Sequence, residues 1–270
     1  MPSFTDQLNR TICLPQTPRR IISLVPSQTE LLFTLGLDET VVGITKFCVH
    51  PETWHHNKPR IGGTKAIDTA RVDALRPDLI IAAKEENEKP QIEALAFRYP
   101  VWISDVKRLS DAIDMIHAVG RLTDTSGKAM TLADEIGREF ATLPGSSPLP
   151  AASAPPFPPA AYFIWRNPWM AAGRDTFIND MLHHCGFSNA FANHDRYPTI
   201  HLPDLAGRPS PIILLSSEPY PFRNRHIDEV REILPDAKIH LVDGEFFSWY
   251  GSRLLQAPAY LRNLRQQIMA

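Results

Sequence analysis

The chain has 270 residues, with 28 Lys and Arg against 30 Asp and Glu, and a formal net charge of −2. Its basic residues are scattered, so the sequence does not favour a nucleic-acid partner. No uninterrupted apolar run approaches the roughly 20 residues of a membrane-spanning helix, and we expect no membrane insertion. The length suits one large domain or two lobes of about 100–130 residues each.

The N-terminal segment, residues 1–20, has polar residues where a signal peptide needs an apolar core. Because Met1 is present, we expect a cytoplasmic protein. The three cysteines, Cys13, Cys48 and Cys185, are odd in number and far apart, and the chain has no Cys-Xaa-Xaa-Cys motif. This pattern argues against a disulfide framework or a zinc ribbon, and it fits a reducing compartment.

The first half of the chain alternates short apolar runs with helical segments. Residues 21–25 predict a buried strand that stops at Pro26. Ser27 then predicts a helix cap, with Glu30 as the second half of a capping box. Further strands are expected over 41–45, 78–83 and 101–104, and helices over 71–75 and 90–98. Apolar strands separated by helices predict a mostly parallel sheet covered on both faces.

From residue 109 to 143 the apolar residues recur at helical spacing, and Gly120 and the segment 123–127 divide this stretch into a shorter and a longer helix. The next segment, 144–160, is rich in proline and has no charged residue, which predicts an exposed connector. Beyond it, strands are expected over 161–165, 212–215 and 238–242, and helices over 176–185, 224–233 and 253–268. Asp175 is the expected N-cap of the first of these helices.

The predicted fold class is therefore α/β, with mostly parallel sheets in two lobes. The expected parts are an N-terminal lobe over 1–108, a linking helix over 109–143, the connector over 144–160 and a C-terminal lobe over 161–270. In open parallel sheets, ligands bind beyond the carboxyl ends of the strands. The segments at those ends in the second lobe are rich in aromatic rings, which suit a large flat ligand. The alternative is that these rings pack the lobe.

Several phrases of the sequence, taken in their order and spacing, resemble a known family. They are Ser27-Gln28-Thr29-Glu30, Val42-Gly43-Ile44, Leu75-Arg76-Pro77-Asp78-Leu79 and Leu182-His183-His184-Cys185-Gly186-Phe187-Ser188-Asn189. Together they resemble the substrate-binding proteins of cobalamin and ferric-siderophore ABC importers, which are helical-backbone metal receptors with the class III periplasmic-binding-protein fold. The resemblance covers nearly the whole chain apart from the connector.

The resemblance implies two Rossmann-like lobes bridged by a long helix, with a ligand cleft between the lobes and no catalytic activity. It implies a metal chelate as the bound ligand, cobalamin first and haem or a ferric siderophore next, and no catalytic cofactor. It also implies that an acidic residue on each lobe docks on an ABC permease. Glu86 and Glu218 are the candidates for that docking.

The loop positions and the resemblance together select the candidate ligand-binding residues. They are Ser27, Phe47, Cys48, His50, Lys84, Trp165, Trp169, Tyr220, Glu245, Trp249, Tyr250 and Arg253. For His50, an axial contact with the chelated metal is the sharper hypothesis, and an incidental structural role is the alternative. Arg253 either holds an anionic group of the ligand or pairs with Asp243 or Glu245.

Two other functions stay open on the sequence alone. Cys48 and His50 alternate along an extended segment and so point to the same side, and with Glu245 they would suit a cytoplasmic metal-dependent enzyme. Motifs of serine hydrolases, zinc proteases and phosphate-binding loops are absent, and the segment 62–65 predicts a turn instead. A protein-interaction module built on the connector is the third possibility, although the connector lacks charged flanks.

Overall fold

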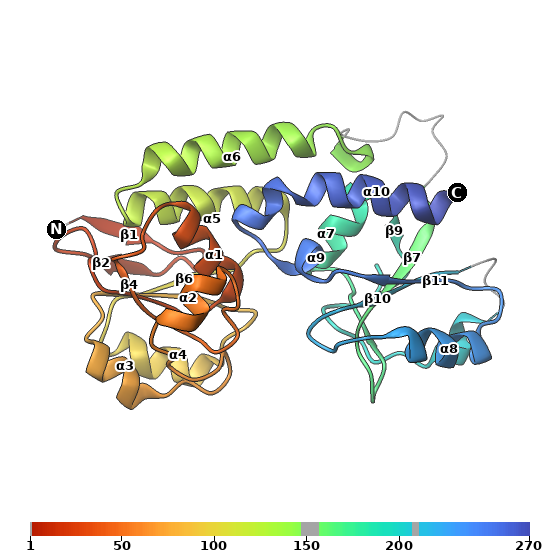
Figure 1. Cartoon of the computed structure of the whole chain (residues 1–270), viewed down its shortest axis with the longest axis horizontal. Helices are drawn as coiled ribbons and strands as arrows, with labels where there is room; N and C mark the ends of the chain where they lie inside the picture. Colours follow the sequence, from red (N-terminus) through yellow and green to blue (C-terminus); the bar gives the residue numbers. More distant parts are fainter. Residues whose placement is uncertain (1, 147–156, 207–210) are drawn as a thin grey trace. The chain divides into compact units, whose positions relative to one another are not determined.

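The structure is a computed structural model that describes residues 2–146, 157–206 and 211–270. The chain divides into two compact units that are not continuous in sequence. Unit 1 comprises Met1–Val106, Ser110–Glu135 and Trp249–Arg253, and unit 2 comprises Lys107–Leu109, Ile136–Ser248 and Leu254–Ala270. A short C-terminal segment, Trp249–Arg253, is therefore built into the unit that contains the N-terminus (Figure 1).

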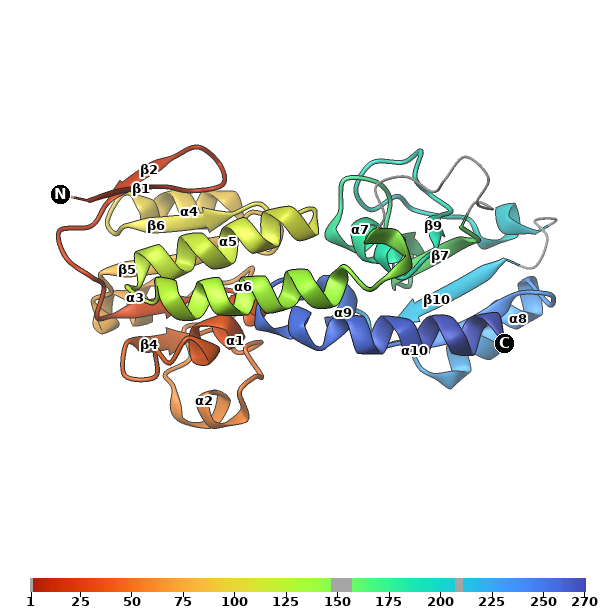
Figure 2. The ribbon, with the colours of Figure 1, turned by 90° about the horizontal axis from the view of Figure 1, so that it is seen from above.

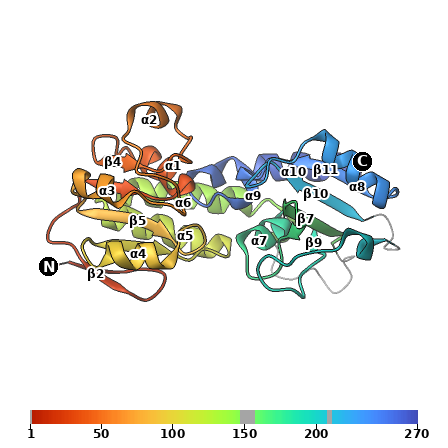
Figure 3. The ribbon, with the colours of Figure 1, turned by 90° about the horizontal axis from the view of Figure 1, so that it is seen from below.

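Unit 1 is built on a four-stranded parallel sheet with the strand order β4-β3-β5-β6. The strands are β3 (Ile21–Ser23), β4 (Val41–Ile44), β5 (Leu79–Ala83) and β6 (Val101–Ser104). The helices in its first part are α1 (Pro26–Thr34), α2 (Glu52–Asn57), α3 (Thr69–Leu75) and α4 (Lys89–Ala96). Helices α3 and α4 lie on one face of the sheet, and α5 (Leu109–Leu122) lies on the other (Figures 1 and 3). The predicted parallel sheet with two covered faces is confirmed.

The start of α1 differs from the prediction. Its N-cap is Val25, no side chain caps the helix, and Pro26 stands in the first turn. Proline suits that place because it has no N–H to leave unsatisfied and its φ is already helical. Ser27 therefore lies inside the first turn, and Glu30 is not part of a capping box. Two further features were not predicted from the sequence. They are the antiparallel pair of β1 (Ser3–Thr5) and β2 (Thr11–Cys13), and helix α2.

The stretch from 109 to 143 is divided into α5 and α6 (Ser126–Phe140), as predicted from the segment 123–127, but Gly120 lies inside α5 and the two helices are nearly equal, with 14 and 15 residues. Figure 2 shows the two helices side by side. Gly120 permits their close approach, since a Cβ at that position would lie 2.4 Å from the Cβ of Ala129. The boundary between the two units falls within α6, between Glu135 and Ile136.

Unit 2 contains a five-stranded sheet, in which β10 pairs in parallel with both β7 and β11. The strands are β7 (Pro159–Trp165), β8 (Met170–Ala171), β9 (Ser188–Asn189), β10 (Ile212–Ser216) and β11 (Lys238–Val242). The helices are α7 (Phe177–His184), α8 (Asn224–Ile233), α9 (Glu245–Ser248) and α10 (Ala257–Met269), with 3-10 turns at Pro144–Ser146 and Leu202–Leu205. A further 3-10 turn, Ser252–Leu255, begins in unit 1, to which Ser252 and Arg253 belong. The predicted α/β class thus holds in both units.

Three expectations for this half need correction. Thr176 is the N-cap of α7, because its hydroxyl accepts a hydrogen bond from the Asn179 N–H, whereas Asp175 precedes the cap in a left-handed conformation. The last helix begins at Ala257 rather than at Arg253, which belongs to a 3-10 turn. Both ends of the proline-rich connector have regular structure, a 3-10 turn at one end and the start of β7 at the other. Its residues 147–156 lie outside the described residues.

Candidate functional site

The carboxyl ends of the four parallel strands of unit 1 share one edge of the sheet. The first turn of α1 follows β3 at this edge, the segment 45–51 follows β4, and the segment 84–88 follows β5. Ser27, Phe47, Cys48, His50 and Lys84, which the sequence selected, therefore gather at one edge of unit 1. Because Trp249–Arg253 belongs to the same unit, three more of the selected residues join that unit.

Arg253 forms a forked ion pair with Glu30 of α1. Its Nε and Nη2 atoms donate to the two carboxylate oxygens at 3.1 and 2.7 Å, and the two side chains are only 12% and 19% exposed. The same guanidinium lies over the Trp249 ring, 5.0 Å from the ring centroid. The sequence selected Arg253, but it missed Glu30 because the pair joins positions 223 residues apart.

The ring of Trp249 also contacts the His50 imidazole. Their centroids are 5.5 Å apart and the planes are inclined by 69°, which is an edge-to-face arrangement. Trp249 and Tyr250 are both buried, and His50 is half-buried. The side chain of Phe47, by contrast, is 50% exposed, and the neighbouring Val49 is also exposed.

Cys48 lies beneath this surface and has no exposed area. Its sulfur is 3.1 Å from the Thr29 hydroxyl and 3.2 Å from the Thr45 hydroxyl. Burial raises the pKa of the Cys48 thiol to about 11. The expectation that its side chain faces the same side as that of His50 fails, because Cys48 is buried against Thr29 and Thr45, whereas the half-buried His50 contacts Trp249.

The remaining polar candidates of unit 1 are held in different ways. Ser27 is buried, and its hydroxyl has no hydrogen-bond partner among the described residues. The ammonium group of Lys84 lies 2.6 Å from the Asp105 carboxylate. Glu86 is half-buried, and its charge contributes to raising the pKa of Cys48 after the larger effect of burial.

In unit 2, the parallel strands β7, β10 and β11 likewise end at a common edge. Trp165 ends β7 with 40% of its side chain exposed, and its ring meets Tyr220 edge-to-face at 5.6 Å. Next to Trp165, Arg166 forks onto the Glu229 carboxylate with two hydrogen bonds of 2.7 Å. This ion pair raises the pKa of the Arg166 guanidinium, first through its hydrogen bonds to Glu229.

Trp169 is part of the packing of unit 2. Its ring stacks on Phe222 at 5.6 Å with an inclination of 14°, and it meets Phe163 edge-to-face at 5.5 Å. Tyr220 also packs against this core, and its hydroxyl lies 3.2 Å from Nε2 of the buried His226. Burial lowers the pKa of His226. Trp165 is therefore exposed at this edge, whereas Trp169 is half-buried and packs on Phe163 and Phe222.

The two acidic candidates of unit 2 lie on neighbouring segments. Glu218 is half-buried, and its carboxylate accepts a hydrogen bond from the Ser248 hydroxyl at 2.5 Å. Glu245 is half-buried at the start of α9, where its backbone N–H donates to the Asp243 carboxylate at 3.1 Å. Glu245 thus belongs to unit 2, whereas Cys48 and His50 belong to unit 1.

The comparison with known proteins identifies the family. A family model described as "Periplasmic binding protein" matches residues 21–231, which is more than half of the chain. The chain belongs to this family. Among curated relatives, a vitamin B12-binding protein of Pectobacterium carotovorum subsp. carotovorum is 25% identical over 252 residues, which cover 89% of this chain and 86% of that protein.

Solved structures show the same fold as this periplasmic binding protein. The periplasmic vitamin B12 binding protein BtuF of Vibrio cholerae superimposes with a TM-score of 0.76 at 19% identity, over 94% of this chain and 99% of that chain. The periplasmic heme-binding protein BhuT, in complex with two hemes, gives a TM-score of 0.77 at 21% identity, over 93% and 99%. At sequence identities of 19% and 21%, this structural similarity establishes the fold of the chain.

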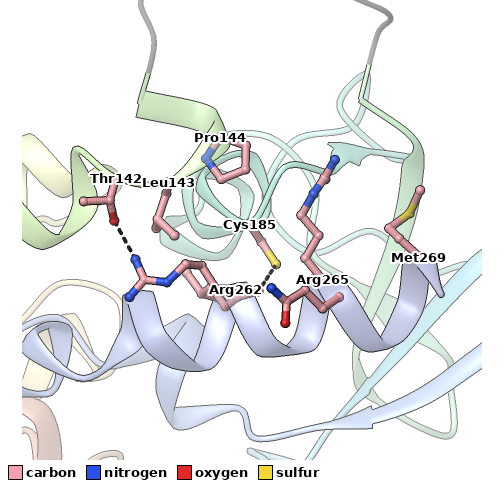
Figure 4. Close-up of a pocket in the computed structure, with 9 residues that line it drawn as sticks. Thr142, Leu143, Pro144, Cys185, Arg262, Arg265 and Met269 are labelled. Atoms are coloured by element: carbon pink, nitrogen blue, oxygen red, sulfur yellow. Dashed lines mark hydrogen bonds between the residues drawn. The ribbon is translucent and has the colours of Figure 1, made fainter.

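A cavity of about 340 Å³ lies on unit 2 of the chain, between α10 and the segment that follows α6 (Figure 4). Its two arginines are hydrogen-bonded to the protein: Arg262 donates to the Thr142 hydroxyl at 2.5 Å, and Arg265 donates to the Gly186 carbonyl. Cys185 lines it, and burial raises the pKa of that thiol to about 12. Of the residues predicted to bind ligand, none lines this cavity.

In residues 2–146, 157–206 and 211–270, no three or more His, Cys, Asp or Glu side chains converge as a metal-binding group. Within the same ranges, every helix is too short or too polar to cross a membrane.

Proposed function

We propose that this chain is a non-catalytic substrate-binding protein of the ABC-importer type, or a cytoplasmic derivative of one, and that it binds a metal chelate. Cobalamin is the first candidate, and haem or a ferric siderophore is the next. The proposal rests on membership of the periplasmic binding protein family and on the names of relatives that bind vitamin B12 or heme.

The observation that carries the proposal is the pair of exposed aromatic rings at the carboxyl edges of the two sheets. Phe47 is 50% exposed in unit 1, and Trp165 is 40% exposed in unit 2. Large exposed rings at or beyond the carboxyl ends of parallel strands offer broad apolar area to a flat ligand, and burial of that area contributes about 25 cal/mol per Å². Haem and the corrin ring of cobalamin both present faces of this kind.

The enzyme alternative has less support. Its nucleophile or metal ligand would be Cys48, but the thiolate is the reactive form, and burial holds the pKa of this thiol at about 11. Metal analysis of protein purified without added chelate separates the two functions. Stoichiometric zinc or iron that is lost in Cys48→Ala would favour the enzyme.

Calorimetric titration of the purified chain tests the proposal directly. The probes are cyanocobalamin, haemin and a ferric trihydroxamate, each at micromolar protein. We expect saturable binding of one probe with one-to-one stoichiometry and no chemical change in the recovered ligand. Absence of binding for all three probes would refute the metal-chelate proposal, and a converted product would refute the non-catalytic part of it.

The partner in this proposal is an ABC permease, with Glu86 and Glu218 as the docking carboxylates. Charge reversal at one carboxylate on each unit tests it: Glu86→Lys and Glu218→Lys should reduce ligand-dependent stimulation of the importer's ATPase without changing ligand affinity. Unchanged stimulation in both variants would contradict these two contacts.

A further inference from the structure

The inference concerns Glu30, which the sequence did not select as a site residue. Glu30 lies on the face of α1 that meets Trp249–Arg253, and a series of contacts leads from its carboxylate through Arg253 and Trp249 to His50. All four side chains belong to unit 1.

The helix that carries Glu30 is held firmly. The Thr29 hydroxyl donates to the Val25 carbonyl at 2.9 Å and lies 2.7 Å from the Ser23 hydroxyl, and the Gln28 amide donates to the Ser104 hydroxyl at 2.6 Å. Leu31 and Leu32 are fully buried. Because a glutamate side chain has several torsions, such a helix limits where its carboxylate can lie, and a contact at the far end is needed to lock it.

The ion pair with Arg253 supplies that contact, and it fixes the Arg253 guanidinium in turn. Two parallel N–H···O bonds to one carboxylate fix the plane of a guanidinium as well as its location. The backbone supports this arrangement: at Gly251 the segment approaches α1 so closely that a Cβ would lie 2.9 Å from the Ser27 carbonyl oxygen. The fixed guanidinium then lies over the indole of Trp249, 5.0 Å from the ring centroid.

We propose that Glu30 is a positioning residue of the ligand site, which through Arg253 holds the Trp249 ring against the His50 imidazole. This inference rests on the proposed function, since it assigns His50, with the buried Trp249 ring packed against it, to the surface that the chelate contacts. It also assigns Arg253 a supporting role, in which its charge faces Glu30 and the indole. Partners that orient a ligand-contacting group typically change affinity about 10- to 100-fold when they are removed.

The test measures the position of Trp249 and the affinity separately. The chain has five tryptophans, so protein labelled with 5-fluorotryptophan gives one ¹⁹F resonance per ring, and Trp249→Phe identifies the resonance of interest. Glu30→Gln keeps the side-chain size but removes the charge, and Arg253→Lys keeps the charge but cannot fork. We expect both variants to shift or broaden the Trp249 resonance and to weaken chelate binding about tenfold or more.

The matched control is Asp73→Asn, which removes the charge of another arginine-paired carboxylate of unit 1, the acceptor of hydrogen bonds from Arg98 Nη1 and the Tyr99 hydroxyl. It should change neither the Trp249 resonance nor the affinity. An unmoved Trp249 resonance in Glu30→Gln overturns the positioning role, and so does a moved resonance with wild-type affinity. If Glu30→Gln does not fold, Arg253→Lys decides by the same two measurements. Failure of the wild-type chain to bind any chelate refutes the proposed function instead, and the resonance still reports on the position of Trp249.

Discussion

The Ser248 hydroxyl donates a hydrogen bond of 2.5 Å to the carboxylate of Glu218, and this contact ties the end of α9 to the loop after β10. A second contact joins the same segments, because the Gly244 N–H donates to the Ser217 hydroxyl at 2.9 Å. There is no room for a side chain at Gly244: a Cβ would lie 2.4 Å from the Ser216 hydroxyl oxygen and 2.6 Å from Cγ of Glu218.

Gly244→Ala should therefore destabilise the protein and displace the Glu218 loop. Forcing one methyl group into a packed site costs about 1–3 kcal/mol. Urea unfolding measures this change in the free energy of unfolding. Gly137→Ala in α6 is the control, because its Cβ would meet no atom within 4 Å and alanine favours the helix by about 1 kcal/mol. Equal stability of the two variants would contradict the close packing at Gly244.

The three thiols should differ sharply in reactivity. Cys13 is exposed, whereas Cys48 and Cys185 are buried, with burial raising their pKa values to about 11 and about 12. Because the thiolate is the reactive species, alkylation of the native protein at pH 8 should modify Cys13 and leave the other two intact. Mass spectrometry of tryptic peptides locates the label, and denaturation in urea should expose all three. Rapid labelling of native Cys48 would show that the core of unit 1 opens.

The same thiols give stability a pH dependence of known sign. Consider a group whose pKa is higher in the folded than in the unfolded chain. Its contribution to the free energy of unfolding is complete at a pH below its unfolded pKa, and it is lost as the pH rises through its folded pKa. The unfolding free energy should thus fall between about pH 9 and pH 11, where unfolded Cys48 ionises and folded Cys48 does not. Cys48→Ser keeps the size and removes the thiol, so its pH profile should be flatter over this range. An unchanged slope would contradict a buried neutral thiol.

Trp165 and Trp169 should separate ligand binding from stability. Trp165→Ala removes an exposed ring and should weaken chelate binding about tenfold, which corresponds to about 1.4 kcal/mol of binding free energy. The free energy of unfolding should be nearly unchanged. Trp169→Ala removes a ring that packs on Phe163 and Phe222, and such truncations cost about 3–5 kcal/mol. Calorimetric titration and thermal unfolding measure the two effects. If Trp165→Ala unfolds while Trp169→Ala stays stable, the assignment of the two rings is reversed.

Local patterns predicted most of the elements. The run 101–104 is the strand β6, and the strand expected over 78–83 is β5 within one residue, because continuous apolar residues leave a parallel strand as the fitting structure. The division of the 109–143 stretch also followed from local signals. The start of α1 did not, since proline at the first position displaced the expected Ser27 cap.

The candidate site was harder to predict from the sequence than the helices and strands were. Sheet topology predicted which loops follow the strands, and Phe47 and Trp165 are exposed there. Sequence alone does not show which way a loop side chain points, and so Cys48 and Trp169 were selected although both contribute to packing. The partner of Arg253 could not be predicted either, because no local pattern relates it to Glu30 on the first helix.

If His50 binds the cobalt of a corrinoid, the visible absorption spectrum of the ligand should change. In aquocobalamin the upper axial position holds an exchangeable water, and an imidazole nitrogen that replaces it changes the visible absorption spectrum. We expect this change on binding to the wild-type chain and its loss in His50→Ala. The exposed His56, which pairs with Glu52, supplies the control, so His56→Ala should retain the change. Cyanocobalamin, whose cyanide blocks that position, should give no spectral change with any of the three proteins. A spectral change that survives in His50→Ala would assign the axial contact to another residue, and the His50–Trp249 pair would then serve only to contact the face of the ring.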